Sequence, residues 1–251
     1  MKTGFLASAF VMAPAIALAH FGLLLPSANM VDDSQDRDTT VTAAFVHPFA
    51  QTGLDLVTPT KLGAWHNGQY RDLLPDATDT TYLDAPAFQA PYRLDLPGVH
   101  IFTMEPQPYW EPAEDVFIVH YTKTYVAAFG DDAGWDQPVG LKTEILPLTR
   151  PFGTWEGSLF QGQVLRDGQP VPNAEVEVEH LNTTGVGMPS ELMETLSVRA
   201  DENGRFSFVA SAPGWWGFAA LTTADYTLSQ DGADKDVELG AVIWVKFEDW
   251  P

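Results

Sequence analysis

The sequence Pro-Tyr-Trp-Glu-Pro-Ala-Glu-Asp-Val-Phe-Ile-Val-His-Tyr-Thr-Lys, residues 108–123, joins an acidic aromatic loop to a long apolar run. Its second half is rich in β-branched and aromatic side chains, which is typical of a strand. Strand alternation places His120 on the same face as Val116 and Ile118, and both faces are largely apolar. This run predicts a strand buried on both sides. Its histidine serves either the core or a functional site.

Short apolar runs separated by turn signals continue along the rest of the chain. The run 39–46 ends at His47 because Pro48 cannot donate a ladder hydrogen bond, so His47 is expected at the rim of a sheet. The Glu-rich run 175–180 is interpreted as a strand with one solvated polar face. Only residues 190–196 suggest a short helix. The sequence predicts an all-β protein with two antiparallel β-sandwiches, residues 20–153 and residues 154–251, the second Ig-like or transthyretin-like.

The composition excludes several classes of function. The 251 residues include 34 Asp and Glu against 13 Lys and Arg, for a formal net charge of −21. Such a surface repels nucleic acid and anionic lipid and attracts cations. The chain has no cysteine, so it can form no disulfide, thiolate metal site or thiol nucleophile. It also lacks phosphate-binding loops, dinucleotide-binding glycine motifs and the common hydrolase motifs, and we expect no enzyme activity.

The first residues have the pattern of a secretory signal peptide. Lys2 precedes an apolar stretch over residues 5–14, and Ala17-Leu18-Ala19 forms a small-residue cleavage site. The apolar stretch is too short to span a membrane. We therefore expect residues 1–19 to be removed, and a periplasmic protein without direct membrane insertion.

Cleavage after Ala19 would leave His20 as the first residue. An N-terminal histidine offers its α-amine and an imidazole nitrogen to the same metal ion, and both groups can be neutral near neutral pH. Because these ligands bind metal only when deprotonated, affinity is expected to fall below about pH 6. The alternatives remain open at this point: His20 is simply where cleavage falls, His47 caps a strand end, and His120 is a core residue.

Several motifs resemble the exported, periplasmic proteins associated with nickel and cobalt uptake systems. The matching segments are Ala19-His20-Phe21-Gly22, His47-Pro48-Phe49, 108–115, 117–123, 134–136, 147–151, 214–219 and 238–241. The resemblance implies binding of Ni²⁺ or Co²⁺ outside the cytoplasmic membrane and delivery to a membrane-embedded nickel/cobalt transporter. It also implies His20, His47 and His120 as metal ligands, since these three histidines fall within the shared motifs.

Mixed nitrogen and oxygen shells suit Ni²⁺ and Co²⁺, and Cu²⁺ or Zn²⁺ could occupy the same ligands in vitro. The candidates for oxygen ligands, or for residues that orient the ligands, are Tyr109, Glu111, Glu114 and Tyr121. Two alternatives compete with metal delivery to a nickel/cobalt transporter. One is a copper chaperone or a histidine-brace copper protein, and the other is a β-sandwich interaction module that binds no metal.

Overall fold

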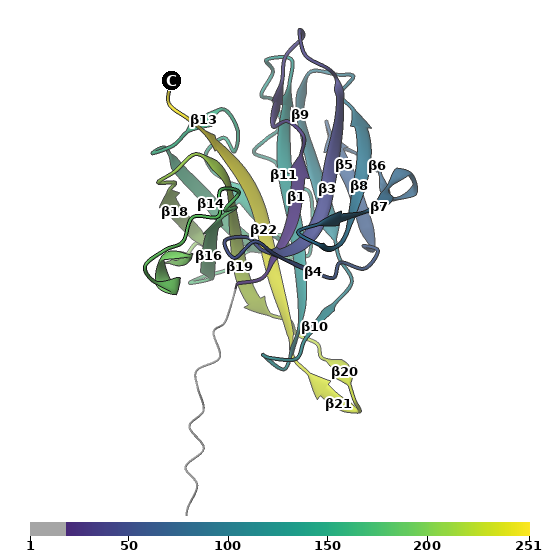
Figure 1. Ribbon diagram of the computed structural model, residues 1–251, viewed down its shortest axis with the longest axis vertical. Helices are drawn as coiled ribbons and strands as arrows, with labels where there is room; N and C mark the ends of the chain where they lie inside the picture. The colour runs from purple at the N-terminus through teal and green to yellow at the C-terminus, as the bar shows by residue number, and fades with distance from the viewer. Residues whose placement is uncertain (1–18) are drawn as a thin grey trace, which may run out of the picture.

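The computed structural model describes residues 19–251, which form strands and two short 3-10 helices (Figure 1). The prediction of an all-β fold is confirmed. The predicted signal peptide, apart from Ala19, lies outside the described residues. The helices are η1 (Leu74–Asp76) and η2 (Glu191–Met193), the second within the segment predicted to be helical. Neither is long enough to cross a membrane.

The strands form four sheets. The first has the order β1-β3-β8-β7, with β4 beside β3: β1 (Phe21–Pro26), β3 (Asp38–His47), β4 (Thr52–Leu54), β7 (Thr78–Tyr82) and β8 (Ala85–Arg93). The second has the order β17-β16-β19-β22-β11-β9-β5-β6, with β10 and β2 on β11 and β13 on β22. Its strands are β2 (Met30–Val31), β5 (Lys61–His66), β6 (Gln69–Asp72), β9 (Gly98–Glu105), β10 (Tyr109–Glu111), β11 (Val116–Ala128), β13 (Thr154–Trp155), β16 (Glu175–His180), β17 (Thr195–Arg199), β19 (Gly214–Thr223) and β22 (Val237–Glu248).

The third sheet has the order β12-β14-β15, with β18 on β14, and the fourth is a hairpin. Their strands are β12 (Thr143–Pro147), β14 (Leu159–Arg166), β15 (Gln169–Pro170), β18 (Arg205–Val209), β20 (Leu228–Gln230) and β21 (Ala233–Lys235). The hairpin β20–β21 and strand β10 lie together at the lower end of the molecule in Figure 1.

The two predicted sandwiches share one sheet. Strand β22 lies in the segment assigned to the second sandwich, yet it pairs in parallel with β11 of the first, placing His120 opposite Gly240. Its other edge pairs with β19 in antiparallel fashion. Because β22 is apolar and buried on both faces, a position in the middle of a covered sheet satisfies it better than an edge. The halves meeting near residue 153 are therefore continuous through the central sheet.

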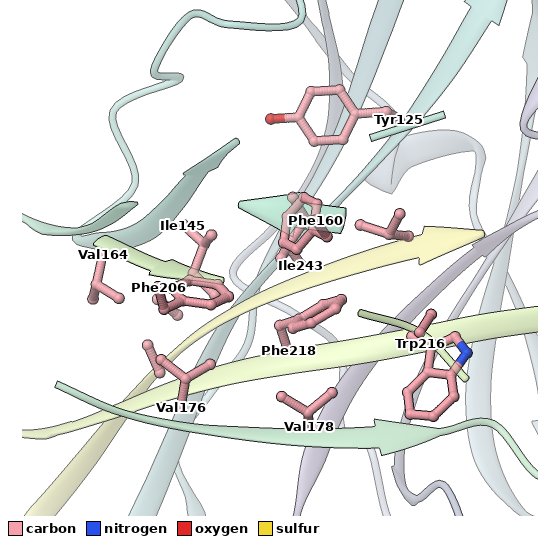
Figure 2. Packing of buried hydrophobic residues seen from close by; sticks show 14 of the residues in the cluster. Tyr125, Ile145, Phe160, Val164, Val176, Val178, Phe206, Trp216, Phe218 and Ile243 are labelled. Carbon is pink, nitrogen blue, oxygen red and sulfur yellow. The ribbon is translucent and has the colours of Figure 1, made fainter. Parts of the chain in front are cut away.

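The other sheets cover opposite faces of this central sheet. On one face, β1 and β3 bury residues such as Leu24 and Phe45 against Ile118 and Val126 of β11 and its neighbours. On the other face, Phe160 of β14 packs on Phe218 of β19, with ring centroids 4.6 Å apart. Figure 2 shows this second core. Apolar side chains on both faces of β11 and β22 thus specify a three-layer arrangement.

Strand β11 is buried on both faces, as its composition predicts. His120 and Thr122 face β1, whereas Lys123 and Tyr125 face the opposite layer. Lys123 Nζ donates a hydrogen bond to Glu144 Oε2 at 2.7 Å, and both side chains are almost completely buried. An ion pair at this depth ties β12 to the centre of the shared sheet.

The interpretation of residues 175–180 as a strand with a solvated polar face is wrong in part. Glu179 is only 3% exposed. Its carboxylate accepts hydrogen bonds from the Phe49 amide, at 3.0 Å, and from the Thr195 hydroxyl. These partners lie far away in the sequence, so alternation alone could not reveal that the acidic face is covered.

Candidate metal site

Strand β1 begins directly after His20, the predicted mature N-terminus, and is fixed to the central sheet at Gly22. The Gly22 amide donates a hydrogen bond to His120 Nδ1 at 3.3 Å, and its carbonyl accepts one from Trp244 Nε1 at 2.8 Å. A Cβ at this position would collide with Thr122 Oγ1. Glycine is therefore required for the close approach of β1 to β11, which places His20 beside the sheet.

His20 and His47 lie side by side. The antiparallel register of β1 and β3 pairs Phe21 with Val46, which brings the residue before one strand opposite the last residue of the other. The two ring centroids are 4.6 Å apart, and both side chains are buried. His20 Nε2 lies 3.0 Å from Glu111 Oε2 of β10. The rim position predicted for His47 is confirmed, and this rim also holds His20 and Glu111.

Burial keeps both imidazoles neutral. It lowers the pKa of His20 to about 4, with a further lowering from His47 and His120 that Glu111 partly opposes. Burial also lowers the pKa of His47. Neutral imidazole is the form that donates a lone pair to a metal ion, so these rings require no deprotonation at neutral pH.

His120 lies near His20 and His47, but its Nε2 faces Glu238. The Phe45 ring contacts both histidines, with centroids 5.7 Å from His20 and 5.8 Å from His120. His120 is 1% exposed, and its Nε2 has no hydrogen-bond partner among the described residues. The carboxylate oxygen Glu238 Oε1 lies 3.5 Å from this nitrogen. A Cβ on Gly240 would collide with the ring, so the space that His120 occupies depends on that glycine.

The four predicted oxygen donors lie at different distances from the histidines. Glu111 contacts His20 directly, and the Tyr109 ring lies 6.3 Å from the His20 ring. Glu114 lies in the exposed loop between β10 and β11. Tyr121 points to the opposite face of β11, where it packs on a buried apolar cluster. The structure therefore brings Glu111 and Tyr109 to the histidines and places Tyr121 away from them.

In residues 19–251, no group of three or more His, Asp or Glu side chains is arranged to hold a metal ion as it stands. The Ala19–His20 peptide bond withholds two further donors. The Ala19 carbonyl accepts a hydrogen bond from His47 Nδ1 at 3.0 Å. The peptide bond also converts the His20 amine into an amide, which is not available as a ligand. His20 and His47 are thus neighbours, but Ala19 engages His47 Nδ1 and the backbone nitrogen of His20.

Residues 17–224 match the family described as DUF4198, a domain of unknown function. The chain belongs to the DUF4198 family. No curated protein matches this DUF4198 chain.

Solved structures similar to the DUF4198 chain include the D0-D1 domain of intimin, with 14% identity, 89% of this chain and 99% of that chain covered, and a TM-score of 0.24. Another is trypsin-activated alpha-2-macroglobulin from Escherichia coli, with 10% identity, 94% and 16% coverage, and a TM-score of 0.27. A third is the set of fibronectin(III)-like modules of Clostridium thermocellum CbhA, with 10% identity, 90% and 95% coverage, and a TM-score of 0.24.

The remaining histidines of this DUF4198 protein have structural partners. His66 and His100 stack with centroids 4.1 Å apart, and His100 also contacts the Tyr92 hydroxyl and the Leu96 carbonyl. His180 Nε2 donates to the Pro213 carbonyl at 2.9 Å. Sequence reasoning leaves these three histidines out of the site, and the structure places them elsewhere. Sequence reasoning misses Glu238, because only the pairing of β11 with β22 brings this residue to His120.

Proposed function

We propose that this DUF4198 protein is a periplasmic carrier that binds Ni²⁺ or Co²⁺ and delivers it to a membrane-embedded nickel/cobalt transporter. The observation that carries the proposal is the buried pair of His20 and His47 with Glu111 against one of its rings. Two neutral imidazoles at one sheet rim offer nitrogen donors to a divalent first-row ion, and the carboxylate beside them can orient a ring.

Cleavage after Ala19 completes this donor set. It frees the His20 amine, which can chelate a metal together with Nδ1 of the same residue. Glu111 already holds His20 Nε2 at 3.0 Å, which leaves Nδ1 for the chelate and orients the ring as carboxylate partners of metal-binding histidines do. Cleavage also removes the Ala19 carbonyl from His47 Nδ1. A single processing event would thus supply one ligand and release a second.

The charge of the chain suits the handling of cations. The formal net charge of −21 raises the local concentration of divalent ions around the protein. Delivery requires that the ion can leave, and His20 and His47 lie at strand ends beside the predicted mature N-terminus and the loop that follows β3.

Copper is the second candidate cargo, and one observation favours it. Of the three predicted ligands, His20 and His47 have their rings in direct contact, while His120 Nε2 faces Glu238. An amine with two imidazoles is the ligand set of a histidine brace, and Cu²⁺ binds such nitrogen donors more tightly than Ni²⁺ does. Titration of Cu²⁺ into protein that begins at His20, read by electron paramagnetic resonance, would distinguish a copper carrier from a nickel or cobalt carrier.

The test is calorimetric titration of Ni²⁺ into protein that begins at His20 and into protein that retains Ala19. We expect tight one-to-one binding by the first and at least a tenfold weaker affinity for the second, since even the loss of a residue that only orients a ligand typically costs about tenfold. A His180→Gln variant is the matched control, since it removes a histidine outside the site. Equal binding by both forms would contradict the amine chelate, and binding by neither would contradict the carrier function.

Delivery is tested separately by uptake of radioactive Ni²⁺ into cells that contain the transporter. Cells that lack this protein should accumulate less Ni²⁺ at low external concentration, and the His20→Ala variant should fail to restore uptake. Unchanged uptake without the protein would contradict delivery even if the protein binds the metal.

A further inference from the structure

An apolar groove lies between the end of β16, the start of β19 and residues 184–196, and its volume is about 420 Å³. Trp216 and His180 belong to its lining, with ring centroids 5.0 Å apart. Trp216, at one end of the core in Figure 2, donates from Nε1 to the Ala212 carbonyl at 2.9 Å. His180 Nε2 donates to the Pro213 carbonyl at the same distance. Because these two nitrogens are already satisfied, both rings are held in place as part of an apolar lining.

The outer wall of the groove is rich in large apolar side chains that water reaches. Of the 14 large hydrophobic side chains exposed among residues 19–251, four fall within residues 186–193: Val186, Met188, Leu192 and Met193. Leu192 is 84% exposed and carries the apolar surface beyond the lining of the groove. Exposed apolar surface gathered in this way marks an interaction site. Methionine is flexible and polarisable, so a wall that contains two methionines adapts to an incoming apolar side chain.

The buried side chain of Asn182 holds this wall in a defined conformation. Its Nδ2 donates to the Phe49 carbonyl at 3.1 Å and to the Val186 carbonyl at 2.8 Å, and its Oδ1 accepts the Val186 amide at 3.0 Å. The Ser190 hydroxyl accepts the Leu192 amide at 3.3 Å and so caps η2. The groove is therefore formed before a ligand arrives, which reduces the free energy lost in ordering it.

The charge around the groove is acidic. Glu194 lines it, Glu191 lies on η2 next to it, and none of the described residues in the lining is Lys or Arg. The sequence also contains no Lys or Arg between Arg166 and Arg199. A second copy of this chain would bring a second acidic groove and a further formal charge of −21, and an anionic membrane would be repelled in the same way. The charge therefore favours a basic partner.

We propose that this groove binds an amphipathic segment of a partner protein, with apolar side chains on one face and Lys or Arg on the other. The apolar face fills the groove against Trp216 and the two methionines, and the cations face Glu191 and Glu194. A small molecule inside the groove would leave Leu192 uncovered, whereas a polypeptide segment covers it as well. This binding goes beyond metal carriage and does not depend on it.

The test uses a designed helical peptide of about 15 residues, with Leu at every third or fourth position and Lys elsewhere. It is titrated by calorimetry into protein that begins at His20, and we expect one-to-one binding. A peptide of the same composition with its leucines on all sides of the helix should bind at least about tenfold more weakly. Met188→Ser/Met193→Ser and Glu191→Lys/Glu194→Lys should each weaken binding at least about tenfold, because they remove anchors and complementary charges.

Two double variants that change exposed residues outside the groove are the matched controls. Val57→Ser/Leu96→Ser replaces side chains that are 55% and 56% exposed, and Glu202→Lys/Asp234→Lys reverses the same number of charges as the groove variant. Each control should weaken binding far less than its counterpart in the groove. In wild type, the peptide should shift the indole ¹⁵N signal of Trp216 and the methyl signals of both groove methionines.

Absence of binding, equal binding of the peptide with scattered leucines, or binding that Met188→Ser/Met193→Ser leaves unchanged would contradict this proposal. If that variant does not fold, the wild-type spectra decide, and unshifted Trp216 and methionine signals contradict it. Weaker binding by protein that retains residues 1–19 would assign the groove to the apolar residues 5–14 of the same chain. A dimer that Leu192→Ser abolishes would assign it to a second copy, and binding of dodecanoate in place of the peptide would assign it to a small apolar molecule.

Discussion

The amide of Gly22 donates to Nδ1 of His120 across 3.3 Å, which joins the first strand of the described chain to the strand at the centre of the fold. This contact assigns the acceptor role to Nδ1 and leaves Nε2 to carry a proton or bind a metal. It also means that the position of His20, two residues earlier, depends on how closely β1 approaches β11.

Gly22→Ala should destabilise the protein, because its Cβ would collide with Thr122 Oγ1. We expect the free energy of unfolding to fall by about 1–3 kcal/mol, the range for added atoms in a packed core. Urea denaturation checks this value. Thr122→Ala in the same chain should restore part of the loss, and strictly additive effects would contradict the collision. Gly187→Ala is the control, because its Cβ would meet open space.

Gly240→Ala should move His120. The new Cβ would collide with the ring from the side opposite Gly22, so the ring must turn or β22 must shift. We expect altered imidazole ¹⁵N shifts for His120 and a weakened Gly22 hydrogen bond, measured as faster exchange of the Gly22 amide. Unchanged shifts and exchange would show that the ring has room that the structure does not indicate.

Lys123→Met should be strongly destabilising, since it leaves the Glu144 carboxylate buried without its partner. The expected loss is about 3–5 kcal/mol in the free energy of unfolding. Adding Glu144→Gln should recover much of it, because it removes the buried charge and its single amide oxygen can still accept the hydrogen bond from Val139 or from Gly140. Lys61→Met removes an exposed ion pair with Glu105 and should cost at most about 1 kcal/mol. Equal losses in Lys123→Met and Lys61→Met would contradict the buried pair.

Stability should fall on acidification through His100. Burial lowers its pKa from 6.5 to about 4; its contact with the Leu96 carbonyl opposes this shift, charge on His66 adds to it, and Asp95 opposes it. The unfolded chain takes up a proton first, so the free energy of unfolding decreases as the pH falls from about 6.5 toward 4. After allowance for solvent screening, the contribution is about 1–2 kcal/mol.

The measurement compares urea denaturation of wild type and His100→Gln at neutral pH and at about pH 4.5. The variant loses the contact with the Tyr92 hydroxyl, so its stability is lower at both pH values and only the difference between them is informative. That difference should be smaller in the variant than in wild type. The same difference in both proteins would show that His100 does not carry this pH dependence.

The sequence was sufficient for features that depend on local pattern. Alternation and β-branched residues predicted β11 with both faces buried, and Pro48 predicted that the strand before it ends at His47. Features that depend on strand partners could not be predicted. Nothing near Glu238 indicates that β22 pairs in parallel with β11, so its approach to His120 required the fold. The stacking of His66 on His100 has the same origin, since β5 and β9 are joined only in the sheet.

The parallel pairing of β11 with β22 has a consequence for how the chain acquires its structure. His120 lies opposite Gly240, so the centre of the sheet joins segments that are far apart in the sequence. Contacts of this kind carry a large loop-closure entropy, which makes folding slow. The core strand β11 can pair with β9 early, but it lacks its partner β22 until residues 237–248 are available. Until β22 pairs, one edge of β11 has no strand partner along residues 117–124, so this part of the shared sheet is completed only by the last strand of the described chain.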